Sequence, residues 1–193
     1  MNDNKFSIHS TPLHNREGQG GASFSQLAEL YRSELLDRVI PFWLNKSQDK
    51  EFGGYFTCLD RDGTVYDTDK FIWMQGREVW MFSKLYNTVE PRQEWLDAAI
   101  QGAEFLKKHG HDGNLNWYFA LDREGHPLVE PYNIFSYTFA VIAFGQLSIA
   151  LALSDPERSA EYADISKRTF EIVLSRLITQ KADGARLRLV PGL

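Results

Sequence analysis

Apolar and polar positions along the chain form two kinds of helical pattern that follow one another. In residues 27–43, apolar side chains recur three and four positions apart while charged ones fill the other side, which predicts an amphipathic helix. Ser23 or Ser25 is a suitable N-cap, and Pro41 should kink or end this helix. Residues 68–86 are apolar on nearly every side, which predicts a second helix that is buried inside the protein.

The two patterns repeat. GYFTCLDRDG (residues 54–63) aligns without a gap on NWYFALDREG (residues 116–125), 62 positions later. Each segment places Asp and Gly between two short extended runs, which predicts a β-hairpin. The alignment continues into the apolar helix, so residues 133–152 predict a second buried helix, and Asp155 and Pro156 open a helix that begins a third unit.

Alternation of half-exposed and buried helices predicts an inner ring of helices wrapped by an outer one, an α/α toroid. The hairpins lead from outer to inner helices and therefore collect at one mouth. The inner-helix N-termini point at this mouth, and their partial positive charge favours an anion or a developing oxyanion there. We expect the functional site at this mouth.

The predicted domain organisation has three parts. Residues 1–22 are polar and Gly-rich and should form a flexible tail. Residues 23–178 should form the toroid, as about two and a half helix–hairpin–helix units. Residues 179–193 show neither the expected hairpin nor a following buried helix, so we expect an irregular tail of a truncated or frame-altered copy.

Composition excludes several classes of partner. A net charge of −5 without a basic run argues against nucleic acid and against an anionic membrane surface. The longest apolar run, residues 139–144, is too short to span a bilayer, and no signal-peptide pattern opens the chain. A single cysteine, Cys58, permits no internal disulfide and is typical of a cytoplasmic protein.

Three polar residues, Gln75, Arg77 and Glu78, interrupt the apolar helix at residues 68–86. A guanidinium inside a buried helix is costly without a partner, and Trp73 lies four residues away on the same face. An aromatic plane beside a fixed cation suits a polar ring-shaped or enolisable ligand. The alternative is a structural ion pair between Arg77 and a carboxylate.

Other candidates carry less information. Tyr132, Phe135 and Tyr137 open the second inner helix at the same mouth, where aromatic side chains could line a sugar pocket or form the barrel core. Residues 60–63 resemble part of a calcium loop, but Gly63 comes too early and no ligating Glu follows. Residues 109–113 contain two histidines without a third ligand nearby, so no metal site is expected.

Three long segments, LYRSELLDRVIPFW, GGYFTCLDRDGTVYDTDKFIWMQGREVW and NWYFALDREGHPLVEPYNIFS, resemble the N-terminal half of the N-acylglucosamine 2-epimerase family. The resemblance spans about residues 27–176. It implies an all-α fold with short β-hairpins, here an incomplete (α/α)6 barrel. It also implies interconversion of N-acetylglucosamine and N-acetylmannosamine without a catalytic metal, ATP as a possible allosteric activator, and a possible homodimer when full length.

The resemblance also implies roles for particular residues. Trp73 and Arg77 are similar to the substrate-contacting Trp and Arg of the family, so Arg77 would hold the enediolate oxygen and Trp73 would wall the pocket. The family's two catalytic histidines lie in its C-terminal half. None of the five histidines here matches them, so the chain is expected to be an incomplete copy; these are His9, His14, His109, His111 and His126.

Alternative functions remain open from the sequence. A related sugar isomerase or epimerase of the mannose or cellobiose type would share the fold. A non-catalytic fragment could bind a sugar or a protein partner through the half-ring. An α/α-barrel glycosidase would need two carboxylates across the mouth, whereas Asp69 and Glu78 are the only acids in the first inner-helix segment and the second offers no matching acid.

Overall fold

The computed structural model describes residues 23–131 and 134–182, which divide into two compact units between Val39 and Ile40. The first unit contains α1 (Phe24–Ser33) and the π-helix η1 (Glu34–Val39). The Ser23 hydroxyl accepts a hydrogen bond from the Gln26 amide at 3.3 Å, and the Gln26 side chain accepts one from the Ser23 amide at 2.8 Å. This reciprocal capping box confirms Ser23 as the N-cap of the first predicted helix.

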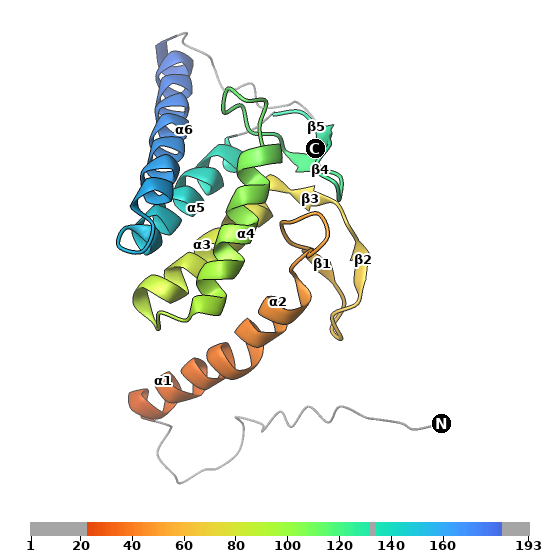
Figure 1. Cartoon of the computed structure of the whole chain (residues 1–193), viewed down its shortest axis with the longest axis vertical. Coiled ribbons are helices and arrows are strands. Elements are labelled where there is room, and N and C mark those ends of the chain that lie inside the picture. Colours follow the sequence, from red (N-terminus) through yellow and green to blue (C-terminus); the bar gives the residue numbers. More distant parts are fainter. Residues whose placement is uncertain (1–22, 132–133, 183–193) are drawn as a thin grey trace. The chain divides into compact units, whose positions relative to one another are not determined.

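The second unit contains the repeated elements, shown in sequence colours in Figure 1. Pro41 is the second residue of α2, which follows the π-helix directly, and the π-helical turn ends two residues before it. The elements in order are α2 (Ile40–Lys46), β1 (Cys58–Leu59), β2 (Val65–Asp67), β3 (Lys70–Phe71), α3 (Ile72–Thr88), α4 (Gln93–His109), β4 (Ala120–Leu121), β5 (Pro127–Val129), α5 (Phe135–Leu151) and α6 (Pro156–Ala182).

Both predicted hairpins are present and match each other. β1 pairs antiparallel with β2, and β4 pairs antiparallel with β5 at the equivalent positions of the repeat. Gly63 and Gly125 lie in the turns of the two hairpins with φ of 86° and 101°, a region that favours glycine. The hydrogen bonds also match, because the Asp60 amide donates to the Thr64 carbonyl and the Asp122 amide to the His126 carbonyl, at 2.8 and 2.9 Å.

The first inner helix begins later than the sequence pattern predicted. Lys70 and Phe71 form β3, which pairs antiparallel with β4, and the Ile72 amide donates to the Phe119 carbonyl at 3.0 Å. The expectation of a helix from residue 68 is therefore wrong for its first turn, because that backbone is paired with the second hairpin. Asp69, which the sequence pattern placed on the inner helix, precedes β3 and lies outside α3.

Within the second unit, α3 packs against α4 and α5, and α5 packs against α6. Figure 1 shows the hairpin strands together at one end of these helices, while the short α3–α4 and α5–α6 connections lie at the opposite end. This is the arrangement that the repeat predicted. The interface between the two inner helices buries apolar side chains from both, among them Ile72, Val79, Phe82, Ala140, Phe144 and Leu147.

The inner helices are not buried on every side, contrary to the prediction from their apolar composition. On α3, Arg77 is exposed and Trp73 is half-buried; on α5, Phe135 and Ile149 are 62% and 63% exposed. These faces point away from the neighbouring helices that the described residues provide. α6 continues to Ala182, past residue 178, where the toroid was predicted to end. The rest of the predicted C-terminal tail and the whole predicted N-terminal tail lie outside the described residues.

Candidate functional site

Gln75, the first of the three polar residues selected from the middle of α3, has a structural role. Its side-chain oxygen accepts a hydrogen bond from the Tyr55 amide, and its side-chain nitrogen donates to the Tyr55 carbonyl, both at 2.8 Å. Gln75 and Tyr55 are each fully buried. The amide group of Gln75 thus takes the place of a neighbouring strand for the backbone of Tyr55, which fixes the start of the first hairpin segment against α3.

Arg77 is an exposed cation near the middle of α3. In residues 23–131 and 134–182 no carboxylate lies within ion-pair distance of its guanidinium, so the alternative of a structural ion pair is not observed. Arg77 borders a hollow of about 320 Å³, and the other residues that line this hollow are Trp43, Met74, Glu78, Trp80 and Met81. We call this hollow the arginine pocket. Its lining offers a planar cation, two indole rings and one buried acid to a ligand.

Trp73 lies one helical turn before Arg77 and lines a different hollow, of about 310 Å³, together with Phe119, Phe135 and Phe139. The Trp73 and Phe139 rings contact each other with centroids 5.9 Å apart. Two of the aromatic residues selected from sequence, Trp73 and Phe135, are thus brought together from α3 and α5. The structure places Trp73 and Arg77 along one helix, but they line separate hollows.

Tyr137 is fully buried, which favours the interpretation of this residue as barrel core. Its hydroxyl accepts a hydrogen bond from the Arg176 guanidinium at 2.8 Å, and this guanidinium also stacks 4.3 Å from the centre of the tyrosine ring. Tyr137 thereby joins α5 to α6. Tyr132, the remaining aromatic candidate, lies outside the described residues.

Glu78 is marked by the sequence only as an acid without a counterpart, and the structure gives it a distinctive position. It is only 8% exposed and forms a short hydrogen bond with Ser47, a fully buried residue just after α2. Burial raises the pKa of Glu78 to about 8, although the bond from Ser47 opposes this shift. The sequence signal was a single acid on a largely apolar helix, but the hydrogen bond that Glu78 makes comes from Ser47, in another part of the chain.

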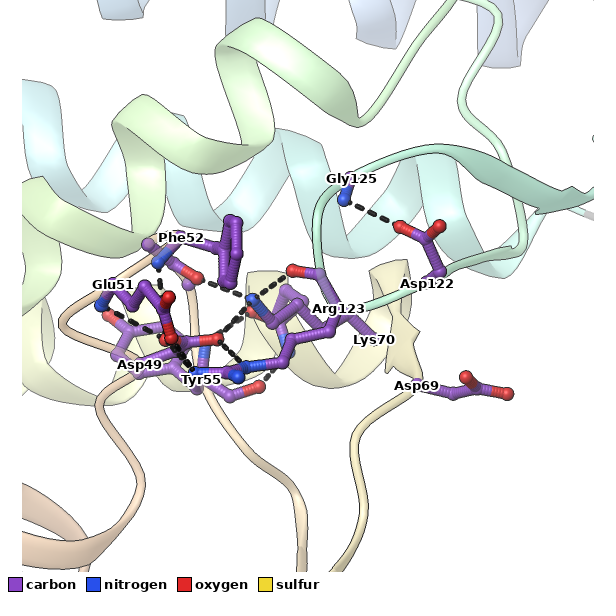
Figure 2. Close-up of polar contacts among 12 residues, drawn as sticks. Asp49, Glu51, Phe52, Tyr55, Asp69, Lys70, Asp122, Arg123 and Gly125 are labelled. Carbon is purple, nitrogen blue, oxygen red and sulfur yellow. Dashed lines mark hydrogen bonds and ion pairs between the residues drawn. The ribbon is translucent and has the colours of Figure 1, made fainter.

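A second group of charges joins the loop after α2, β3 and the turn of the second hairpin, and was not found from the sequence (Figure 2). The fully buried ammonium group of Lys70 donates to Asp49 at 3.0 Å and to the carbonyls of Gly53 and Arg123, each at 2.7 Å. Arg123 in turn donates to both carboxylate oxygens of Asp49, at 3.0 and 3.2 Å, and to Glu51 at 2.8 Å. We call Asp49, Lys70 and Arg123 the buried triad after its two buried members, Asp49 and Lys70, whereas the Arg123 side chain is 37% exposed.

The charges of the buried triad satisfy one another. Burial alone would raise the pKa of Asp49, but hydrogen bonds from Arg123, Lys70 and two backbone amides outweigh it and lower the pKa to about 2. Burial lowers the pKa of Lys70, and the Asp49 carboxylate opposes this change. The triad connects the loop after α2, β3 and the second hairpin, and the three acceptors around the Lys70 ammonium leave it no donor for a ligand.

The histidines of the described part lie away from both hollows. His109 packs on Phe105, His111 lies against Trp117, and the exposed His126 binds Asp122 at 2.9 Å. The described ranges contain no group of three or more His, Cys, Asp or Glu side chains arranged to hold a metal ion. Among the described helices, none combines the length and the hydropathy that crossing a bilayer requires.

The repeated hairpins, the inner and outer helices and the cation on an inner helix define a protein of the α/α-barrel class. The structure of cellobiose 2-epimerase from Spirochaeta thermophila is similar, with a TM-score of 0.68 over 79% of this chain and 36% of that chain, at 24% sequence identity. This likeness confirms the predicted fold class, a portion of an (α/α)6 barrel.

The sequence comparison then defines the family. Residues 54–188 match the model of the N-acylglucosamine 2-epimerase family, so the chain belongs to that family. N-acylglucosamine 2-epimerase of Mus musculus is 47% identical over 116 residues, which are 58% of this chain and 28% of that protein. Cellobiose 2-epimerase of Ruminococcus albus is 33% identical over 144 residues, 72% of this chain and 36% of that protein. The chain thus spans about a third of the length of these relatives.

Proposed function

We propose that this chain is part of a sugar 2-epimerase that interconverts N-acetylglucosamine and N-acetylmannosamine. The observation that carries the proposal is the exposed guanidinium of Arg77, which has no ion-pair partner among the described residues and lies on the inner helix of a chain from this family. The identity to N-acylglucosamine 2-epimerase, at 47%, exceeds the 33% identity to a cellobiose 2-epimerase, which favours the amino sugar over the disaccharide.

The proposed reaction runs through the open-chain sugar. A base removes the proton from C2 beside the aldehyde, the resulting enediolate carries negative charge on oxygen, and an acid returns a proton to the opposite face of C2. Arg77 would stabilise the enediolate oxygen through its planar fork of N–H donors. Trp73 and Phe135 would form an aromatic wall for the sugar.

The base and the acid are proposed to come from residues outside this chain, because none of the described histidines lines the hollow beside Arg77 or that beside Trp73. The chemistry that we propose is proton transfer with electrostatic stabilisation and does not call for a metal. ATP as an allosteric activator, a homodimer of the full-length form and a cytoplasmic location belong to the same proposal, and are supported by the family resemblance and by the single cysteine.

Substitution of Arg77 tests the proposal. In a form of the protein that spans the length of its relatives, Arg77→Ala and Arg77→Lys should each lower the conversion of N-acetylmannosamine by about 100-fold or more, because lysine lacks the planar fork. The thermal midpoint should change little, since the side chain is exposed. Exposed Lys84→Ala, on the same helix, is the matched control. Near-normal turnover in Arg77→Lys contradicts the assigned role.

A further inference from the structure

The hydrogen bonds around Glu78 form a relay that can run in two directions. The Ser47 hydroxyl lies 2.7 Å from the Trp43 carbonyl oxygen and also contacts the Glu78 carboxyl group. A hydroxyl has one proton, so Ser47 can donate to only one of these two acceptors at a time. When Glu78 is protonated, it donates to Ser47 and Ser47 donates to Trp43. When Glu78 is ionised, Ser47 must turn toward the carboxylate, and the carbonyl of Trp43 loses the hydroxyl.

The surroundings of Glu78 do not compensate a negative charge. Among the described residues it has no ion-pair partner: Arg77 and Lys84 on α3 and Lys46 on α2 are exposed. α5 carries no charged residue, and Glu94 and Asp97 at the start of α4 are exposed. Tyr55 is the ionisable group that interacts with Glu78, and it is an acid whose hydroxyl donates to the Ala98 carbonyl at 2.7 Å. Among the described residues, a charge on Glu78 therefore has only the Ser47 hydroxyl to stabilise it.

Ser47 also has a key position in the chain. Its amide donates to the Trp43 carbonyl at 2.9 Å, and its own carbonyl accepts from the Phe56 amide. The end of α2, the start of the first hairpin segment and α3 are thus joined at one fully buried hydroxyl residue. Trp43 and Glu78 contribute to the arginine pocket from different helices, α2 and α3. Ser47 therefore bonds both the backbone of Trp43 and the side chain of Glu78, two residues that line that pocket.

We propose that Glu78 is a positioning residue that, in its neutral form, holds Trp43 against α3 through Ser47 and so keeps the arginine pocket in the shape that accepts the sugar. Ionisation reverses the relay, loosens Trp43 and weakens binding beside Arg77. The effect on the sugar rests on the proposed function, whereas the change in the pocket wall can be measured without any ligand.

The first experiment follows the tryptophans in the full chain between pH 6.5 and 9.5. Trp95 and Trp117 are 1% and 0% exposed, so acrylamide should quench mainly the other three tryptophans. Quenching should rise with a midpoint near pH 8, which is the pKa of Glu78. Trp43→Phe should remove the step. Circular dichroism over the same range separates this change from unfolding.

Variants assign the step. In Glu78→Gln the amide still donates to Ser47 without ionising, so quenching should stay at its low-pH value throughout. In Ser47→Ala no hydroxyl remains to bond the Trp43 carbonyl at any pH, so the step should disappear and quenching should stay at its high-pH value throughout. Glu171→Gln, an exposed carboxylate on α6, is the matched control and should keep the step. A step that persists in Glu78→Gln, or the absence of a step in the wild type, overturns the proposal.

The second experiment uses a form of the protein that spans the length of its relatives. Calorimetry measures its affinity for N-acetylmannosamine. If only the neutral form binds and the pKa is about 8, the competent fraction falls from about nine tenths at pH 7 to about one tenth at pH 9, so the apparent Kd should rise about tenfold. Glu78→Gln should bind the sugar with the same Kd at pH 7 and pH 9. Equal affinity of the wild type at both values overturns the positioning role. Failure to bind at any pH instead refutes the proposed function, and the quenching result still tests the relay.

Discussion

The two repeats of the second unit share the positions of their hairpin strands and glycine turns but differ in chemistry. The hairpin and inner helix of residues 54–88 align in sequence with residues 116–150, with strands and glycine turns at equivalent positions. On the helices, however, the polar residues Gln75, Arg77 and Glu78 stand where the second repeat has Tyr137, Phe139 and Ala140. The shared positions form the fold, and the first repeat alone adds an exposed cation and a buried acid.

The arginines in the turns of the two hairpins also share a position and differ in chemistry. Arg61 and Arg123 occupy equivalent positions, yet Arg61 is exposed without an ion pair among the described residues, whereas Arg123 binds Asp49 and Glu51. The second hairpin lies beside the loop that precedes the first, and this loop supplies the carboxylates. Identical residues in identical turns thus differ in role because they have different neighbours.

The largest effect is expected from the buried triad, which exists only at the junction of the repeats. Lys70→Ala should lower the free energy of unfolding by about 3–5 kcal/mol, because it leaves the buried Asp49 with less compensation and empties a fully buried site. Urea denaturation measures the change. Lys108→Ala, an exposed lysine on α4, should change stability by less than about 0.5 kcal/mol. Equal small losses in both variants would show that the triad contributes nothing.

The buried acid of the first repeat should make stability depend on pH. The pKa of Glu78 is about 8 in the folded chain, against an ordinary value of 4.5, so the unfolded chain loses this proton first. The contribution is fully present below pH 4.5 and is lost as the pH rises through 8. From pH 5 to pH 9 the wild type should lose about 4 kcal/mol that Glu78→Gln does not lose.

Urea denaturation of both proteins at the two pH values checks this prediction. If the free energy of unfolding falls equally with pH in the wild type and in Glu78→Gln, the carboxyl group of Glu78 is not the source of the pH dependence. Ala140 at the equivalent position of α5 is fully buried and has no titratable side chain, so Ala140→Ser serves as a control for a general effect of altering an inner helix at this depth.

The smallest effect should distinguish the two equivalent aromatic residues Tyr55 and Trp117, both fully buried. The Tyr55 hydroxyl donates to the Ala98 carbonyl at 2.7 Å, and the Trp117 indole donates to the Thr169 hydroxyl at 3.2 Å. Tyr55→Phe should cost about 1 kcal/mol, because the helical carbonyl remains bonded. Thr169→Val should cost somewhat more, about 1–3 kcal/mol, since a buried N–H is left unpaired.

Thermal unfolding of the two variants measures this difference. Trp117→Phe combined with Thr169→Val removes both partners, and its loss should be smaller than the sum of the single losses. An additive result contradicts a hydrogen bond between the two side chains.

The repeat and the order of elements within each unit could be predicted from the sequence alone. Spacing of apolar residues defined the helices, and Asp and Gly between extended runs defined both hairpins, because these are local rules of backbone and side-chain geometry. Arg77 and Trp73 could also be selected, since a cation on an apolar helix is conspicuous in sequence. The alignment of residues 54–63 on 116–125 then fixed the order of inner and outer helices.

Which polar residues are exposed, paired or ionised became clear from the three-dimensional structure. It exposed Arg77, buried Glu78 beside Ser47, and brought Lys70 to Asp49 and Arg123 from three segments that are remote in sequence. It also showed that Lys70 and Phe71, which the sequence pattern predicted as helix, form β3. Such outcomes depend on desolvation and on partners contributed by other elements, and a periodic pattern contains neither, because it records only the side of its own helix on which a residue lies.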